Sequence, residues 1–140
     1  MSRIFWDTNL FIYLFEPNSR FSALTIQLRT RMLARGDQLL TSTLTLGEVL
    51  VKPMERGNTA LCKAYETAIA RSAVLLSFDA QAAKNYAMLR RDRSIRAPDA
   101  IQLACAAAAG MDLFVTNDDR LQGKQVPGIQ FIVPLDRAPI

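Results

Sequence analysis

The chain has 140 residues, half of them hydrophobic, which is enough for one domain with a substantial core. It carries a formal net charge of +4 and contains no histidine, so Ser-His-Asp catalysis, Cys-His catalysis and histidine metal ligation are all excluded. Its two cysteines, Cys62 and Cys105, are isolated, which favours free thiols over a zinc or redox site. No apolar stretch reaches membrane-spanning length and no targeting segment is visible, so we expect a cytoplasmic protein with no membrane partner.

Short apolar runs alternate along the chain with segments whose apolar residues recur at helical spacing. In chain order, these patterns predict a strand over residues 3–6, helices over 8–15 and 21–34, a strand over 39–41, helices over 43–52 and 59–71, a strand over 73–76, helices over 80–89 and 99–109, and strands over 113–116 and 129–133. This alternation predicts an α/β domain with a mainly parallel sheet. Because we find no internal repeat or linker, we expect residues 1–140 to form a single domain.

Polar, glycine and proline residues mark the ends of the predicted helices. Asp7-Thr8 and Asn58 are positioned to cap helices, and Pro98 lies in the first turn of the helix over residues 99–109. The segments expected to end the first three helices are Glu16-Pro17-Asn18-Ser19, Gly36-Asp37 and Lys52-Pro53.

Four carboxylates lie where strands end or helices begin in this pattern. Asp7 and Asp118 follow predicted strands, Glu48 lies early in a helix that follows a strand, and Asp99 comes directly after Pro98. In an open parallel sheet, ligands bind beyond the carboxyl ends of the strands, where such residues meet. Each acid also suits an ordinary role: a helix cap for Asp7 and Asp99, a solvated position for Glu48 and a turn for Asp118.

Brought together, four carboxylates would raise one another's pKa unless cations neutralised them. Oxygen ligands without histidine or cysteine select Mg²⁺ or Mn²⁺. Such ions activate water and stabilise the leaving oxygen of a phosphodiester. A basic chain with a local acidic cluster suits an anionic substrate met through divalent ions, although excess arginine also serves solubility alone.

Four motifs in series resemble the signatures of the PIN-domain family: Asp7-Thr8-Asn9, Thr45-Leu46-Gly47-Glu48, Ala97-Pro98-Asp99-Ala100-Ile101-Gln102-Leu103-Ala104 and Val115-Thr116-Asn117-Asp118. The likeness extends over nearly the whole chain, and the size and layout are most similar to the VapC-type ribonuclease toxins of prokaryotic toxin–antitoxin pairs. The resemblance implies a three-layer α/β/α sandwich and a Mg²⁺- or Mn²⁺-dependent endoribonuclease that hydrolyses RNA phosphodiester bonds. It also implies a homodimer and inhibition by a cognate antitoxin protein.

The resemblance implies a role for each residue of these motifs. Asp7, Glu48, Asp99 and Asp118 correspond to the family's catalytic acids. Asp7, Asp99 and Asp118 would hold the metal, and Glu48 would position water or a second ion. The residues expected to support the site are Thr8, Asn9, Thr116 and Asp119, the last of which suits a helix cap equally well.

Arginines near the acids are candidates for RNA contact. The arginines upstream of Asp99 are Arg90, Arg91, Arg93 and Arg96, and Arg120 follows Asp118. For Arg90 and Arg91, phosphate contact and plain surface solubility are equally good explanations. We expect RNA contacts from Arg93, Arg96 and Arg120.

Two other functions stay open on the sequence alone. The acidic cluster could hold the basic residues of a partner without turnover, or the chain could be a PIN nuclease of RNA processing without an antitoxin. A phosphatase or receiver domain is less suitable, because no lysine follows an apolar strand. The aromatic residues of the first predicted helix fit core packing, but in the resembling toxins nearby helices also form a groove for the antitoxin.

Overall fold

The computed structural model describes residues 1–17 and 19–140, so Asn18 of the predicted helix break lies outside the described residues. Five strands form one sheet in the order β3-β2-β1-β4-β5, and every pair of neighbouring strands is parallel. The strands are β1 (Arg3–Trp6), β2 (Gln38–Ser42), β3 (Val74–Leu76), β4 (Met111–Val115) and β5 (Ile129–Val133). The prediction of a mainly parallel sheet is confirmed.

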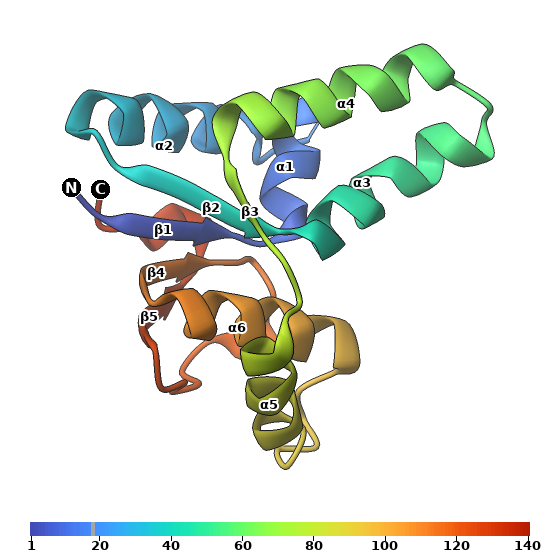
Figure 1. Ribbon diagram of the computed structural model, residues 1–140. Coiled ribbons are helices and arrows are strands. Elements are labelled where there is room, and N and C mark those ends of the chain that lie inside the picture. Colours follow the sequence, from blue (N-terminus) through green and yellow to red (C-terminus); the bar gives the residue numbers. More distant parts are fainter. Residues whose placement is uncertain (18) are drawn as a thin grey trace.

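Helices cover both faces of this sheet (Figure 1). On one face lie α1 (Thr8–Phe15), α2 (Ser22–Arg35), α3 (Thr43–Glu55) and α4 (Thr59–Ser72), and on the other lie α5 (Ala80–Leu89) and α6 (Ala97–Ala109). Two short 3₁₀ helices cover Asp119–Leu121 and Leu135–Arg137. The three-layer α/β/α sandwich that the family resemblance implied is therefore present. Within the described ranges, no helix has both the length and the apolar character needed to cross a membrane.

The central strands separate two hydrophobic cores. Ile4 and Trp6 of β1 pack into the core beneath α1 to α4, whereas Phe5 faces the core beneath α6. The ring of Phe5 stacks on that of Phe114 in β4, with 4.9 Å between the ring centroids. Because side chains alternate across a sheet that is covered on both faces, these strands are apolar at almost every position.

The strand order places a topological switch between β1 and β4. From β1 the chain moves outward through β2 to β3, then returns to β4 and continues outward in the opposite direction to β5. Such a switch leaves a crevice beyond the carboxyl ends of the two central strands. Asp7 directly follows β1 and Thr116 directly follows β4, so both lie at this crevice.

Several element boundaries differ from their predictions, among them the end of α3 and the starts of α6 and β4. Helix α3 does not end at Lys52-Pro53 but continues to Glu55. Proline lacks a backbone donor and is costly in a helix interior, but only the last turn follows Pro53, and the Arg56 N–H still bonds to the Lys52 carbonyl. Strand β4 begins at Met111, two positions before the predicted start, because Met111 pairs with Ile129 of β5.

Candidate functional site

A pocket of about 220 Å³ opens at the carboxyl edge of the sheet, and we call it the acidic pocket. Its lining residues are Asp7, Thr8, Asn9, Ile12, Glu48, Pro98, Asp99, Gln102 and Asp118. All four predicted acids are therefore brought together, although they come from four separate segments of the chain. Asp7 caps α1, Glu48 lies on α3, Asp99 lies in the first turn of α6, and Asp118 caps the 3₁₀ helix after β4.

Asp7 is the most buried of the four acids, with 8% of its surface exposed. Its Oδ1 accepts a hydrogen bond from the Thr8 backbone N–H at 2.8 Å, and its Oδ2 accepts one from the Thr116 hydroxyl at 2.7 Å. Burial raises the pKa of Asp7, the nearby charges of Glu48 and Asp118 raise it further, and the two hydrogen bonds oppose this rise. Asp7 therefore caps α1 and lines the acidic pocket at the same time.

Asp99 is half-buried, and its pKa is raised to about 6. Burial is the largest cause, followed by the negative charges of Asp118 and Asp7, whereas Arg120 and Arg96 act in the opposite direction. A carboxylate whose pKa is raised by neighbouring carboxylates is stabilised in its charged form by any added cation.

Asp118 is paired with an arginine two residues further along the chain. Arg120 donates from Nε to Asp118 Oδ1 at 3.0 Å and from Nη2 to Oδ2 at 2.7 Å. These bonds lower the pKa of Asp118. The Asp118 backbone N–H also donates to the Thr116 hydroxyl at 3.1 Å, which connects the loop after β4 to Asp7 through one threonine.

Glu48 belongs to the exposed part of the site. Its Oε1 accepts a 2.6 Å hydrogen bond from the Thr8 hydroxyl, which joins α3 to the start of α1. The pairing of Glu48 with Thr8 was not part of the sequence prediction, which gave each residue a separate role.

Gln102 is a residue of the site to which the sequence analysis gave no role. It is 2% exposed and its amide group contacts Ser42, Thr45, Thr8 and Asp7. The available signal was a lone amide inside the apolar run Ala100-Ile101-Gln102-Leu103-Ala104, since a buried amide requires partners.

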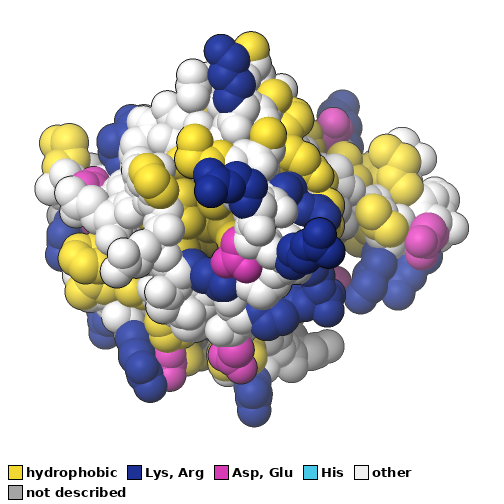
Figure 2. Space-filling view, turned by 90° about the horizontal axis from the view of Figure 1, so that it is seen from below, with side chains coloured by type: hydrophobic (Ala, Val, Ile, Leu, Met, Phe, Trp, Pro, Cys, Tyr) yellow, Lys and Arg dark blue, Asp and Glu magenta, His cyan; other side chains and the backbone are white. Residues whose placement is uncertain are grey.

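The remaining predicted residues divide into two groups. Thr8 and Asn9 line the acidic pocket and Thr116 bonds to Asp7, whereas Asp119 is exposed and is not among the lining residues. Arg96 and Arg120 lie close enough to the acids to act on their pKa values, and Arg93 is exposed on the segment between α5 and α6. Figure 2, which views the molecule from the side of α5, shows Lys and Arg side chains gathered on this face with acidic side chains among them.

The residues of the acidic pocket can be compared with the needs of a divalent cation. In the part of the chain that the structure describes, no group of three or more Asp, Glu, Cys or His side chains is arranged to hold a metal ion. Three of the carboxylates are engaged by protein donors: Asp7 by Thr116 and the Thr8 N–H, Asp118 by Arg120, and Glu48 by the Thr8 hydroxyl. The donor chemistry does fit Mg²⁺ or Mn²⁺, because the pocket offers oxygen ligands without nitrogen or sulfur.

A second observation supports this fit. Asn9 Oδ1 is buried at the acidic pocket and accepts no hydrogen bond from any described residue. A buried acceptor without a donor is costly, and a hydrated cation would supply the missing donor. The prediction that Asp7, Asp99 and Asp118 hold a metal stays a prediction.

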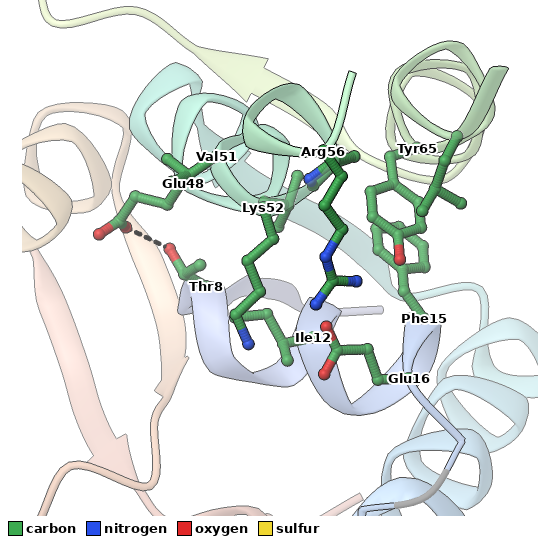
Figure 3. A pocket seen from close by; sticks show the side chains of 12 residues that line it. Thr8, Ile12, Phe15, Glu16, Glu48, Val51, Lys52, Arg56 and Tyr65 are labelled. Atoms are coloured by element: carbon green, nitrogen blue, oxygen red, sulfur yellow. Dashed lines mark hydrogen bonds between the residues drawn. The ribbon is translucent and has the colours of Figure 1, made fainter. Parts of the chain in front are cut away.

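A larger cavity of about 340 Å³ adjoins the acidic pocket, between α1 and the hairpin of α3 and α4 (Figure 3). We call it the helical groove, and its lining residues are Thr8, Ile12, Phe15, Glu16, Glu48, Val49, Val51, Lys52, Pro53, Arg56, Leu61 and Tyr65. Lys52 of α3 and Arg56, which directly follows α3, extend toward Glu16, which directly follows α1. The Phe15 ring stacks on Tyr65 with 4.6 Å between centroids. Thr8, Ile12 and Glu48 line both cavities, so the Thr8–Glu48 hydrogen bond lies in the wall that they share.

The family model described as PIN domain matches residues 4–126 of the chain. No curated protein matches the sequence. The match covers all four acids and the whole region from β1 to the segment that precedes β5.

Several solved structures share the fold at low sequence identity. A chain of VapBC2 from Rickettsia felis, bound to a DNA fragment from its promoter, is 17% identical with a TM-score of 0.71, over 94% of this chain and 98% of that one. A chain of a toxin–antitoxin complex from Klebsiella pneumoniae is 22% identical with a TM-score of 0.66, over 93% and 99%. A chain of DNA-bound VapBC from Salmonella typhimurium is 20% identical with a TM-score of 0.71, over 96% and 99%.

Proposed function

The chain belongs to the PIN-domain family, and from this premise we propose that it is a Mg²⁺- or Mn²⁺-dependent endoribonuclease that acts as the toxin of a type II toxin–antitoxin pair. The observation that carries the proposal is the convergence of Asp7, Glu48, Asp99 and Asp118 on one small pocket at the switch point of the sheet. The pKa values of Asp7 and Asp99 are raised at this place, and a bound cation would offset the repulsion between the neighbouring carboxylates.

In this proposal, Asp7, Asp99 and Asp118 hold the cation. When bound, the cation supplies a Lewis acid for the scissile phosphate and lowers the pKa of a coordinated water. Thr116 and the Thr8 backbone N–H keep the Asp7 carboxylate in one orientation. Asp118 becomes available when Arg120 turns from its carboxylate to a phosphate oxygen of the RNA.

Glu48 would orient the attacking water. The Thr8 hydroxyl occupies Oε1, and among the described residues Oε2 has no hydrogen-bond partner, so Oε2 can accept a proton from water. Hydrolysis by this route leaves a 5′-phosphate and a 3′-hydroxyl. The alternative route through the ribose 2′-oxygen generally uses histidine, which the chain lacks.

Basic side chains near the acidic pocket would bind the RNA backbone. Arg96 and Arg120 lie beside the acids, and Arg93 is exposed on the same segment as Arg96. Guanidinium groups bind phosphate oxygens well, and the net charge of +4 favours association with a polyanion.

The helical groove would receive a segment of the antitoxin. It is apolar between α1 and α4, with Glu16, Lys52 and Arg56 at its charged edge, which suits an amphipathic segment of a partner protein. The complexes from Rickettsia felis, Klebsiella pneumoniae and Salmonella typhimurium are described as toxin–antitoxin or VapBC assemblies, which supports the same kind of partner here. A homodimer is part of the proposal through the family resemblance and is tested by light scattering of the purified protein.

Cleavage of RNA by the purified protein tests the enzymatic part of the proposal. We expect cleavage of single-stranded RNA with Mg²⁺ or Mn²⁺ and none with EDTA. Asp7→Asn and Asp99→Asn should each lower the rate by at least about a thousandfold, because an amide cannot replace a carboxylate beside a cation. The matched control is Asp136→Asn, an exposed acid in the 3₁₀ helix Leu135–Arg137. Full activity in EDTA would contradict the metal-dependent mechanism.

One observation favours a second function, a non-catalytic acidic module that binds basic residues of a partner. Arg120 already occupies both oxygens of Asp118, so the acidic pocket accepts a guanidinium group. Under this alternative, the protein binds an arginine-rich partner but cleaves no RNA with either ion. If the protein is instead a PIN nuclease of RNA processing, it should cleave RNA, and no antitoxin gene should lie beside its own gene.

A further inference from the structure

Gln102 lies at the centre of a buried hydrogen-bond network that reaches the acidic pocket. Its Nε2 lies 2.7 Å from Thr45 Oγ1, 3.1 Å from Thr8 Oγ1 and 3.4 Å from Asp7 Oδ1. Its Oε1 accepts a short hydrogen bond from the Ser42 hydroxyl. These partners lie at the junction of β1 with α1 and at the junction of β2 with α3, so one side chain of α6 joins two distant segments of the chain.

The orientation of the Gln102 amide is fixed by its surroundings. Ser42 Oγ already accepts a hydrogen bond from the Leu44 N–H at 3.2 Å, which leaves its proton free to donate to Gln102 Oε1. The reverse orientation would place Oε1 beside the Asp7 carboxylate, where two acceptors repel each other. The amide nitrogen therefore faces Thr8, Thr45 and Asp7.

This orientation decides where each threonine proton goes, because every hydroxyl has a single proton. Thr41 must donate to the Trp6 carbonyl at 2.9 Å, since a carbonyl oxygen only accepts. Thr45 Oγ1 lies 2.8 Å from Thr41 Oγ1 and 2.7 Å from Gln102 Nε2, and it accepts from Gln102 because an amide nitrogen only donates.

The Thr8 hydroxyl also has a single proton to donate. Its oxygen accepts from Gln102 Nε2 at 3.1 Å and lies 3.2 Å from Thr45 Oγ1. The Thr8 proton is directed to Glu48 Oε1 at 2.6 Å, because a carboxylate oxygen only accepts. The network therefore ends at the Thr8 hydroxyl, which donates to one oxygen of the Glu48 carboxylate.

We propose that Gln102 is a positioning residue that holds the Thr8 hydroxyl as a donor to Glu48 and thereby fixes the orientation of the Glu48 carboxylate at the acidic pocket. Groups that orient a site's functional side chains typically change activity by about 10–100-fold when they are removed. The consequence for RNA cleavage rests on the proposed function, whereas the direction of the hydrogen bonds does not.

The first experiment measures the hydrogen bonds themselves by NMR. In the wild-type protein we expect a Thr8 hydroxyl proton that exchanges slowly enough to be observed and shows contacts to the Gln102 amide protons. Gln102→Met keeps a side chain of similar length but removes both donors, so the Thr8 hydroxyl signal should disappear. Leu103→Met, a buried neighbour on α6, is the matched control and should retain it. A Thr8 hydroxyl signal that persists unchanged in Gln102→Met would overturn the proposal.

The second experiment separates positioning from a merely structural role by steady-state kinetics on RNA. Gln102→Met should lower kcat by about 10–100-fold and leave KM within about twofold. Gln102→Asn, which keeps an amide but is one methylene shorter and cannot reach Thr8, should lower kcat similarly and covers the case in which Gln102→Met does not fold. Thr8→Ser keeps the hydroxyl and should retain most of the activity.

A double-mutant cycle then tests the route through Thr8. Thr8→Val alone should lower kcat as Gln102→Met does, and the double variant should show no further loss, because both changes remove the same donor from Glu48. Losses that multiply would overturn the proposal. If the wild-type protein cleaves no RNA, the proposed function fails, and the hydroxyl-proton measurement alone decides the role of Gln102.

Discussion

Arg120 holds Asp118 through two parallel hydrogen bonds, one to each carboxylate oxygen. The side chain of Asp118 is 17% exposed and that of Arg120 is 44% exposed, so the pair lies at the mouth of the acidic pocket. A guanidinium group that engages both oxygens of a carboxylate partly neutralises its charge and repels an approaching cation. Arg120 and a divalent ion therefore compete for Asp118.

Replacing Arg120 should change metal binding and RNA binding in opposite directions. Arg120→Ala frees Asp118, so we expect Mn²⁺ to bind several-fold more tightly, measured by titration calorimetry in the absence of RNA. The same change removes a phosphate contact, so RNA should bind more weakly, and the slope of log K against log salt should fall by about 0.7 for a single strand. Arg137→Ala, an exposed arginine on another 3₁₀ helix, is the control and should alter neither quantity. Unchanged Mn²⁺ affinity in Arg120→Ala would show that the pair does not restrict the site.

The raised pKa of Asp99 predicts how stability changes with pH. Its pKa is about 6 in the folded protein against 3.8 for an ordinary aspartate carboxyl, so in EDTA the folded state binds more protons than the unfolded state between these values. The contribution of Asp99 to stability is then fully present below about pH 4 and is lost as the pH rises through about 6. Asp99→Asn should remove this loss and, because half-exposure screens the effect, raise the free energy of unfolding at pH 7 by on the order of 1 kcal/mol.

Urea denaturation of wild type and Asp99→Asn in EDTA, repeated between pH 4 and pH 7, measures this difference. Addition of Mn²⁺ at pH 7 should stabilise the wild type more than the variant. Stability curves that stay parallel over this range would mean that Asp99 titrates as an ordinary exposed carboxyl.

Thr116 should be important to stability as well as to the site. Its buried hydroxyl donates to Asp7 Oδ2 at 2.7 Å and accepts from the Asp118 N–H at 3.1 Å. Thr116→Val keeps the shape but removes a hydrogen bond to a buried carboxylate, which should cost about 1.5–3 kcal/mol of unfolding free energy at neutral pH. Thr30→Val, on the exposed surface of α2, should cost much less. Equal losses in the two variants, measured by urea denaturation, would argue against a specific role for Thr116.

The helical groove should be separable from the acidic pocket by mutation. Ile12 lines both cavities, whereas Tyr65 lines only the groove. Tyr65→Ala removes the ring that stacks on Phe15 and should weaken binding of the cognate antitoxin by about tenfold or more, as expected for a buried aromatic anchor. RNA cleavage by the free protein should remain. Glu66→Gln, the exposed neighbour on α4, serves as the control in a calorimetric titration with the antitoxin. Loss of cleavage together with binding would mean that the two cavities act as one site.

Much of the secondary structure and the set of acidic site residues could be predicted from the sequence. The apolar runs 3–6 and 129–133 become β1 and β5 with the predicted bounds. The run of β1 reflects burial on both faces of the sheet, whereas β5 lies at the sheet edge and leaves Phe131 exposed. Asp7 and Asn58 cap helices as predicted, since a cap depends only on a side chain and the backbone donors that follow it. The order of the four acidic motifs and the parallel sheet together predicted that Asp7, Glu48, Asp99 and Asp118 meet, and they line one pocket.

Only the tertiary structure decided how those acids are held. The pairing of Arg120 with Asp118 and of Thr8 with Glu48 depends on side-chain directions that periodicity does not describe. The role of Gln102 was not predicted, because its partners lie on segments far away in the sequence and only the strand order brings them together. The sequence by itself determined which four carboxylates reach the acidic pocket. The folded chain decided which of their oxygen atoms are free to act, because hydrogen bonds between distant segments exist only once the sheet has placed them side by side.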